Sequence, residues 1–117
     1  MTQRRKHHRL MNPRACTLVF ENKRYDTRLL DVSLRGALVD LPVGLKPDVG
    51  HAYRLEIPLE DSDGMIAMEV APAHQDAGRM GLTCFSIDME SMTHLRRMLE
   101  LNLGDPNLIE QELRQLD

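Results

Sequence analysis

The sequence predicts a mainly β protein: a six-stranded antiparallel β-barrel or sandwich with α-helices at its C-terminal end. Six short apolar segments are separated by turn residues at near-regular spacing, a pattern typical of small antiparallel barrels and sandwiches. Beyond residue 90 the apolar residues recur every three or four positions, which indicates helices. The chain of 117 residues is long enough for one such domain. Of the two β architectures we expect the barrel.

The first three predicted strands cover residues 15–21, 24–32 and 36–41. In the first strand Cys16, Leu18 and Phe20 alternate with other residues, so they are expected to share one face. A turn at residues 21–23 leads into the second strand.

The last three predicted strands cover residues 51–59, 65–73 and 79–87. Tyr53, Leu55 and Ile57 give the fourth strand the alternation of a half-buried strand. The sequence Asp61-Ser62-Asp63-Gly64 predicts a turn that makes the fourth and fifth strands a hairpin. Pro72 predicts that the fifth strand lies at an edge or contains a bulge.

Two helices are expected after the strands. The first helix is expected to begin near Ser91 and to carry an apolar face that extends to Leu103. Gly104 is placed to end this helix. Asp105-Pro106 combines a helix N-cap with a proline at the first helical position. The second helix would then carry an apolar face of four residues, namely Leu108, Ile109, Leu113 and Leu116.

Charge is unevenly distributed along the chain. We divide it into a flexible basic N-terminal arm (residues 1–14), the barrel (15–90) and C-terminal helices packed on the barrel (91–117). The arm carries five cations and no carboxylate, whereas the other 103 residues carry ten cations and eighteen carboxylates, a net charge of −8. This contrast predicts one local contact with an anionic partner and argues against a nucleic acid polymer as the partner.

Several classes of protein do not fit the composition. The apolar runs are far shorter than the roughly 20 residues of a membrane span, so we expect no membrane insertion. Cys16 and Cys84 are too far apart in the sequence for a CxxC zinc or redox site. We therefore expect a cytoplasmic protein with reduced thiols and with neither a metal nor a cofactor.

Two arginines four residues apart, Arg5 and Arg9, stand in the basic arm, and Arg4 directly precedes them. Guanidinium groups form paired hydrogen bonds with phosphate oxygens and with the O6/N7 edge of guanine. They also stack on the faces of aromatic rings. Taken alone, the same cluster fits a solvated, disordered arm.

A second motif, Asp31-Val32-Ser33-Leu34-Arg35-Gly36, lies between the second and third predicted strands. The Asp31 carboxylate can accept hydrogen bonds from the N1–H and N2–H₂ edge of guanine, and the Ser33 hydroxyl can donate to phosphate. Gly36 permits a positive φ and a close approach of the backbone to a ligand. Taken alone, these residues also fit a hairpin turn.

Together the two motifs resemble the signature of the PilZ domain family, bacterial receptors for the second messenger cyclic di-GMP. The signature is RxxxR followed by a strand pair and then D/N-x-S-x-x-G, which Arg5, Arg9, Asp31, Ser33 and Gly36 match. Six strands with terminal helices also resemble the family's architecture. The segment from residue 94 to 105 is similar to stand-alone, single-domain members, so the resemblance covers nearly the whole chain.

The resemblance implies roles for these residues. Arg5 and Arg9 would clamp a phosphate and the Hoogsteen edge of guanine. Asp31 and Ser33 would hold base and phosphate, while Gly36 keeps the floor of the site open.

Three further positions follow from the same resemblance. Arg4 matches members that bind a stacked, intercalated dimer of the ligand. Many relatives carry an aromatic residue, often Trp, where this chain has His74, whose imidazole can stack on guanine over a smaller area. Gly81 stands where relatives also have glycine.

The resulting hypothesis is a non-enzymatic effector that binds cyclic di-GMP and orders its arm over the barrel, where an unidentified downstream protein recognises it. The alternative is a protein–protein adaptor of the same fold that binds no nucleotide. A phosphodiesterase would need paired carboxylates with metal-binding histidines, or an activated nucleophile. A nucleic-acid binder would need stacking aromatics, and the acidic body of the chain has few.

Overall fold

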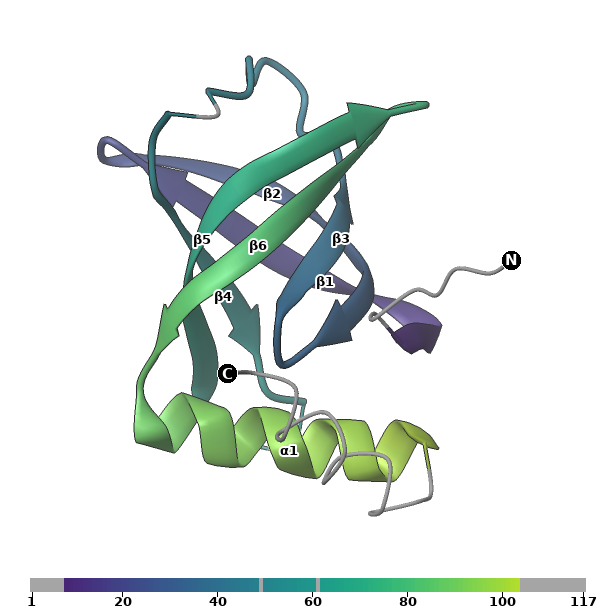
Figure 1. The fold of residues 1–117 in the computed structure, drawn as a ribbon. Coiled ribbons are helices and arrows are strands. Elements are labelled where there is room, and N and C mark those ends of the chain that lie inside the picture. The colour runs from purple at the N-terminus through teal and green to yellow at the C-terminus, as the bar shows by residue number, and fades with distance from the viewer. Residues whose placement is uncertain (1–7, 49, 61, 104–117) are drawn as a thin grey trace.

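The computed structural model describes residues 8–48, 50–60 and 62–103, with the side chains of residues 13–48, 50–60 and 62–101. Its six strands form a closed barrel in the order β1-β2-β3-β6-β5-β4, and all neighbouring strands are antiparallel (Figure 1). The elements are β1 (His8–Phe20), β2 (Lys23–Ser33), β3 (Gly36–Asp40), β4 (Tyr53–Pro58), β5 (Met65–Asp76), β6 (Arg79–Ile87) and α1 (Met89–Leu103). The predicted barrel with a C-terminal helix is confirmed.

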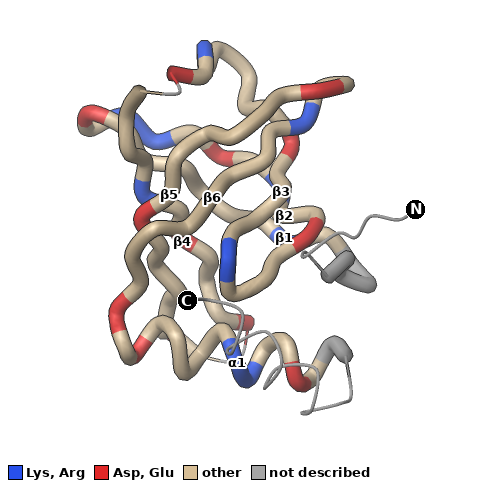
Figure 2. The backbone as a smooth tube through the Cα atoms, in the orientation of Figure 1, with Lys and Arg blue, Asp and Glu red and all other residues tan. Residues whose placement is uncertain are grey.

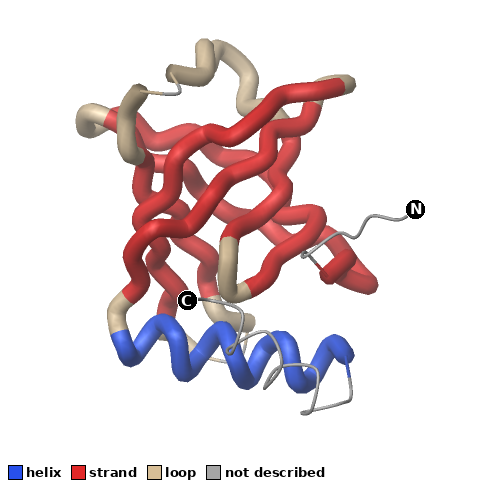
Figure 3. The backbone as a smooth tube through the Cα atoms, viewed as in Figure 1, coloured by secondary structure: helices blue, strands red, loops and turns tan. Residues whose placement is uncertain are grey.

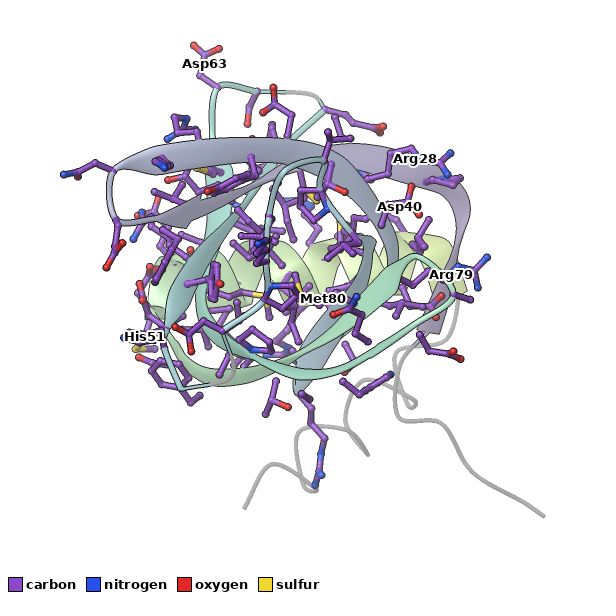
Figure 4. All side chains as sticks on the ribbon, turned by 90° about the horizontal axis from the view of Figure 1, so that it is seen from above. Arg28, Asp40, His51, Asp63, Arg79 and Met80 are labelled. Carbon is purple, nitrogen blue, oxygen red and sulfur yellow. The ribbon has the colours of Figure 1, made fainter. Side chains whose placement is uncertain are left out.

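The core fills the inside of the barrel. Viewed along the barrel, Met80 points into the interior, whereas Arg28 and Arg79 lie on the outside (Figure 4). The predicted alternation holds in β4, where Tyr53, Leu55 and Ile57 are buried. The inward-facing residues of the other strands are likewise buried: Cys16, Leu18, Leu29, Val32, Ala37, Val39, Ile66, Met68, Val70 and Leu82.

Helix α1 crosses one open end of the barrel (Figure 3). Leu95 and Leu99 are fully buried and join the same core cluster as the strands. Arg14 fixes this end, because its guanidinium donates to the Pro58 carbonyl at 2.6 Å and contacts the Met98 sulfur. Arg14, which we had counted with the arm, is therefore part of the barrel end.

Strand β1 begins at His8, well before the predicted start at residue 15. His8 pairs with Val32 and Arg9 pairs with Asp31, and the register then shifts before Arg14 pairs with Leu29. β1 has more residues than β2 between these two pairs, so the strand bulges there. The barrel therefore takes in residues that we assigned to the arm.

Pro72 marks a bulge. The register of β5 against β6 shifts between Pro72 and His74, and β5 lies between β4 and β6, so it is not an edge strand. The helix predicted after residue 104 lies outside the described residues. Within the described part, no helix has the length and apolar character needed to cross a membrane.

Candidate ligand-binding site

Five strands bring residues of both motifs into one row across the barrel. The pairs are Arg9 with Asp31, Asp31 with Leu38, Leu38 with Gly81, and Gly81 with His74. Paired residues of antiparallel strands point to the same face, and neighbouring strands lie about 4.8 Å apart. We call these five positions the first row.

A second row lies alongside, two residues away on β2, β3 and β6 and three residues away on β5, where the strand bulges. It pairs Ser33 with Gly36, Gly36 with Thr83, and Thr83 with Ala71. Both rows face outward, because the residues that alternate with them, Ala37 and Leu82 among them, are buried in the core. The site therefore lies on the outer surface of the barrel.

Asp31 and Ser33 are fully buried although they belong to the outward rows. Asp31 has an interaction partner within the chain. The Ser33 hydroxyl accepts a hydrogen bond from the backbone N–H of Arg35 at 3.0 Å, which closes the turn between β2 and β3. The motif thus shapes a hairpin, and its two polar side chains are engaged before any ligand arrives.

Gly36 is required for a reason that differs from our expectation. Its φ is not positive, since Gly44 and Gly78 are the glycines with positive φ in the described part of the chain. Instead, a Cβ at Gly36 would overlap the backbone carbonyl oxygen of Leu82 on β6. Gly36 lets two strands approach each other closely, and this contact supplies a structural reason for the glycine.

Gly81 and His74 form a contact across β5 and β6. The two residues are paired, and a Cβ at Gly81 would overlap the imidazole ring of His74. The ring therefore lies over the bare backbone of Gly81 and leans toward β3. His74 is exposed, so its imidazole offers a flat surface at the end of the first row.

The arm residues are only partly within the described structure. Arg4 and Arg5 lie outside the described residues, and Arg9 is described by its backbone alone. The backbone is still informative, because it places Arg9 directly opposite Asp31.

The other charged candidates belong to the surface of the barrel. Arg24 and Arg28 repeat the RxxxR spacing, but they form ion pairs with Glu56 and Asp40 at 2.7 Å each. Positions of both charge signs are distributed along the described backbone (Figure 2). Arg24 and Arg28 are thus exposed strand charges with partners on the barrel surface.

The described side chains offer no metal centre or reactive thiol. Within them, no three His, Cys, Asp or Glu side chains are arranged to hold a metal ion. Both cysteines are free, and burial raises the pKa of Cys16 to about 12, which keeps the thiol protonated. A cleft of about 400 Å³ between Arg14, the β4–β5 turn and α1 is lined by no residue of either row.

Sequence reasoning missed Leu38 and Thr83, which complete the two rows. Leu38 is part buried between Asp31 and Gly81, and Thr83 is exposed beside Gly36. Leu38 lies two residues from Gly36 on β3, and Thr83 lies two residues from Gly81 on β6. Residues two apart on a strand point to the same face, so this spacing from the two glycines was the signal that could have identified Leu38 and Thr83.

Comparison with known proteins agrees with the fold. A model of the PilZ domain family matches residues 3–101. The crystal structure of the PilZ domain of CeSA from a cellulose-synthesizing bacterium is similar with a TM-score of 0.60 and 13% identity, over 83% of this chain and 96% of that one. The structure of the Bacillus subtilis inhibitor of motility (MotI/DgrA) is similar with a TM-score of 0.64 and 22% identity, over 99% of this chain and 55% of that one. This chain thus spans about half the length of the Bacillus protein.

Proposed function

The chain belongs to the PilZ domain family, a cyclic di-GMP-binding family whose members are generally not enzymes, and we propose that it is a non-enzymatic receptor for this dinucleotide. The observation that carries the proposal is the first row. Its register sets Arg9 of one motif beside Asp31 of the other, with His74 at the far end.

The proposed binding mode follows the chemistry of the ligand, which has two guanines and two phosphodiester groups. Asp31 accepts hydrogen bonds from a guanine edge, Ser33 donates to a phosphate, and Arg5 and Arg9 bind phosphate and guanine with paired hydrogen bonds. A second guanine stacks on the imidazole of His74. Stacking of this kind contributes about 1–3 kcal/mol per base on aromatic side chains.

Arg4 extends this proposal to ligand stoichiometry. Arg4 adds a third cation to Arg5 and Arg9, as in members of the family that bind a stacked, intercalated dimer of the dinucleotide. Titration that yields two ligands per chain would support this extension, and a ratio of one would contradict it without affecting the receptor proposal.

The basic arm provides the proposed output. Asp31 and Ser33 are buried in the described structure, so binding must expose them to the ligand. The Ser33 hydroxyl accepts from the Arg35 N–H, and its own proton remains available to a phosphate oxygen. We propose that the arm orders over the ligand and that a downstream protein recognises the changed surface. Hydrogen exchange of residues 1–12 is expected to slow when cyclic di-GMP is added. Equal exchange with and without ligand would contradict the ordering.

Calorimetric titration with cyclic di-GMP tests the receptor function. Wild-type protein is expected to release or absorb heat, and Arg9→Ala and Ser33→Ala are expected to weaken affinity about tenfold or more, which corresponds to 1.4 kcal/mol or more. Cyclic di-AMP is the matched control, because its adenine edge lacks the N1–H and N2–H₂ donors. Equal affinity for the two dinucleotides would contradict the role of Asp31.

One observation favours a second function. The complete burial of Asp31 and Ser33 also suits an adaptor that keeps the hairpin for its fold alone. A folded wild-type protein that gives no heat with cyclic di-GMP would establish the adaptor as the better proposal.

A further inference from the structure

Arg35 occupies the turn between β2 and β3, between Ser33 and Gly36 of the second motif. Its backbone is held on both sides. The N–H donates to the Ser33 hydroxyl at 3.0 Å, and the carbonyl accepts from the backbone N–H of Cys84 at 2.7 Å. The turn is thereby tied to β6, and the Arg35 side chain starts from a fixed point next to the second row.

The side chain of Arg35 is a part-buried cation. Its Nε atom is buried and has no hydrogen-bond partner among the residues that the structure describes. A guanidinium N–H removed from water without an acceptor is unfavourable. An anionic group that reached this nitrogen would satisfy it.

The remaining arginines with described side chains are in a different situation. Most of them have a partner: Arg14, Arg24, Arg28, Arg54 and Arg96. Arg79 and Arg97 form no hydrogen bond or ion pair within the described ranges, but both are exposed and can be hydrated. Among the arginines with described side chains, only Arg35 combines partial burial with a buried nitrogen that has no acceptor and with no other polar partner.

We propose that Arg35 is a further phosphate-binding residue, which contacts a phosphodiester group of the bound dinucleotide. This inference rests on the proposed function. Arg9 lies on β1, opposite Asp31, whereas Arg35 lies in the β2–β3 turn beside Ser33. A ligand with two phosphodiester groups matches two separate cationic positions. Partial burial strengthens such a contact, because the attraction between charges grows as the local dielectric falls.

The test compares Arg35 with a matched arginine. Arg35→Ala and Arg35→Gln are expected to weaken cyclic di-GMP binding about tenfold in calorimetry, and Arg35→Lys is expected to recover part of the loss because it keeps the charge. Arg79→Ala is the control, since Arg79 also has no partner among the described residues but lies on the exposed end of β6 (Figure 4). It is expected to bind as wild type does.

The outcomes separate this inference from the receptor proposal. If wild type binds and both Arg35→Ala and Arg35→Gln bind equally well, Arg35 has no role and the receptor function stands. If wild type does not bind, both proposals are overturned. Thermal unfolding of each variant identifies any loss of fold, and Arg35→Gln keeps the length of the side chain should Arg35→Ala unfold.

Discussion

Gly81 and His74 are coupled through one contact, so their effects on binding are expected to be coupled as well. In Gly81→Ala the new Cβ displaces the imidazole ring from the backbone, and the stacking surface moves with it. We expect Gly81→Ala and His74→Ala each to weaken cyclic di-GMP binding about fivefold, or about 1 kcal/mol. Calorimetry measures both effects.

The double variant tests the coupling. Once His74 is alanine, Gly81→Ala has no ring to displace, so the double variant is expected to bind like His74→Ala alone. Strictly additive losses would contradict the coupling. Urea unfolding serves as the control, because the displaced group is the end of an exposed side chain and the stability is expected to change little.

Gly36→Ala is expected to behave in the opposite way. Its Cβ would overlap the carbonyl oxygen of Leu82, and a backbone group cannot swing aside as a side chain does. We expect a loss of about 1–3 kcal/mol in the free energy of unfolding, measured by urea denaturation. A Gly36→Ala protein as stable as wild type that binds ligand poorly would show that the glycine serves the ligand alone.

Gly36 and Gly81 also show what the sequence alone can predict about single residues of the site. The motif identifies Gly36, but the atom that excludes a side chain belongs to Leu82, far along the chain. The match of Gly81 to a family glycine identifies the position. The reason that a side chain is excluded there is the position of the His74 ring. Contacts between distant segments decide why a residue is needed, and local patterns do not contain them.

At the scale of elements, Asp88 and Ser91 fix the start of α1. Asp88 accepts hydrogen bonds from the Ser91 N–H at 2.7 Å and from the Ser91 hydroxyl at 3.2 Å. The Ser91 hydroxyl in turn accepts from the backbone N–H of Ala67 at 3.0 Å. This chain of hydrogen bonds caps the helix and attaches it to β5.

The cap makes the stability contributed by Asp88 depend on pH. The hydrogen bond from the Ser91 N–H lowers the pKa of Asp88 below its usual value, so the unfolded chain binds the proton more readily than the folded one. The contribution is complete above the unfolded pKa of about 3.9 and is lost as the pH falls through the lower folded pKa. We expect the urea midpoints of wild type and Asp88→Asn to differ at pH 7 and to converge below about pH 4.

The comparison of the two proteins isolates Asp88, because all other carboxylates are common to both. A difference in midpoint that stays constant from pH 7 to pH 3 would show that the Asp88 charge does not stabilise the cap.

Most elements were predictable from the sequence, and the exception is the first part of β1. Strands β2 to β6 and α1 lie close to their predicted ranges, because each carries a run of apolar residues that turn residues bound. The first part of β1 was missed since its register shifts between Arg9 and Arg14. A shift of this kind leaves no period in the sequence, although the partner strand β2 still supports the pairing.

At the scale of the whole molecule, the distribution of charge and the net charge make opposite predictions about the ligand. The chain has a net charge of −3, whereas residues 1–14 alone carry five cations and no carboxylate. Cyclic di-GMP is an anion. The net charge would repel it, and the local charge of the arm would attract it.

Ionic strength decides between these two effects, because salt screens attraction and repulsion alike and the Debye length falls from about 10 Å at 0.1 M to 3 Å at 1 M. If the arm governs association, raising sodium chloride from 50 to 500 mM is expected to weaken binding several-fold, mainly through a slower association rate in stopped-flow measurements. A variant with Arg4→Gln and Arg5→Gln removes two of the arm's cations and is expected to lose most of this dependence. Tighter binding by wild type at high salt would show that the net charge of −3 dominates and that the arm does not steer the ligand.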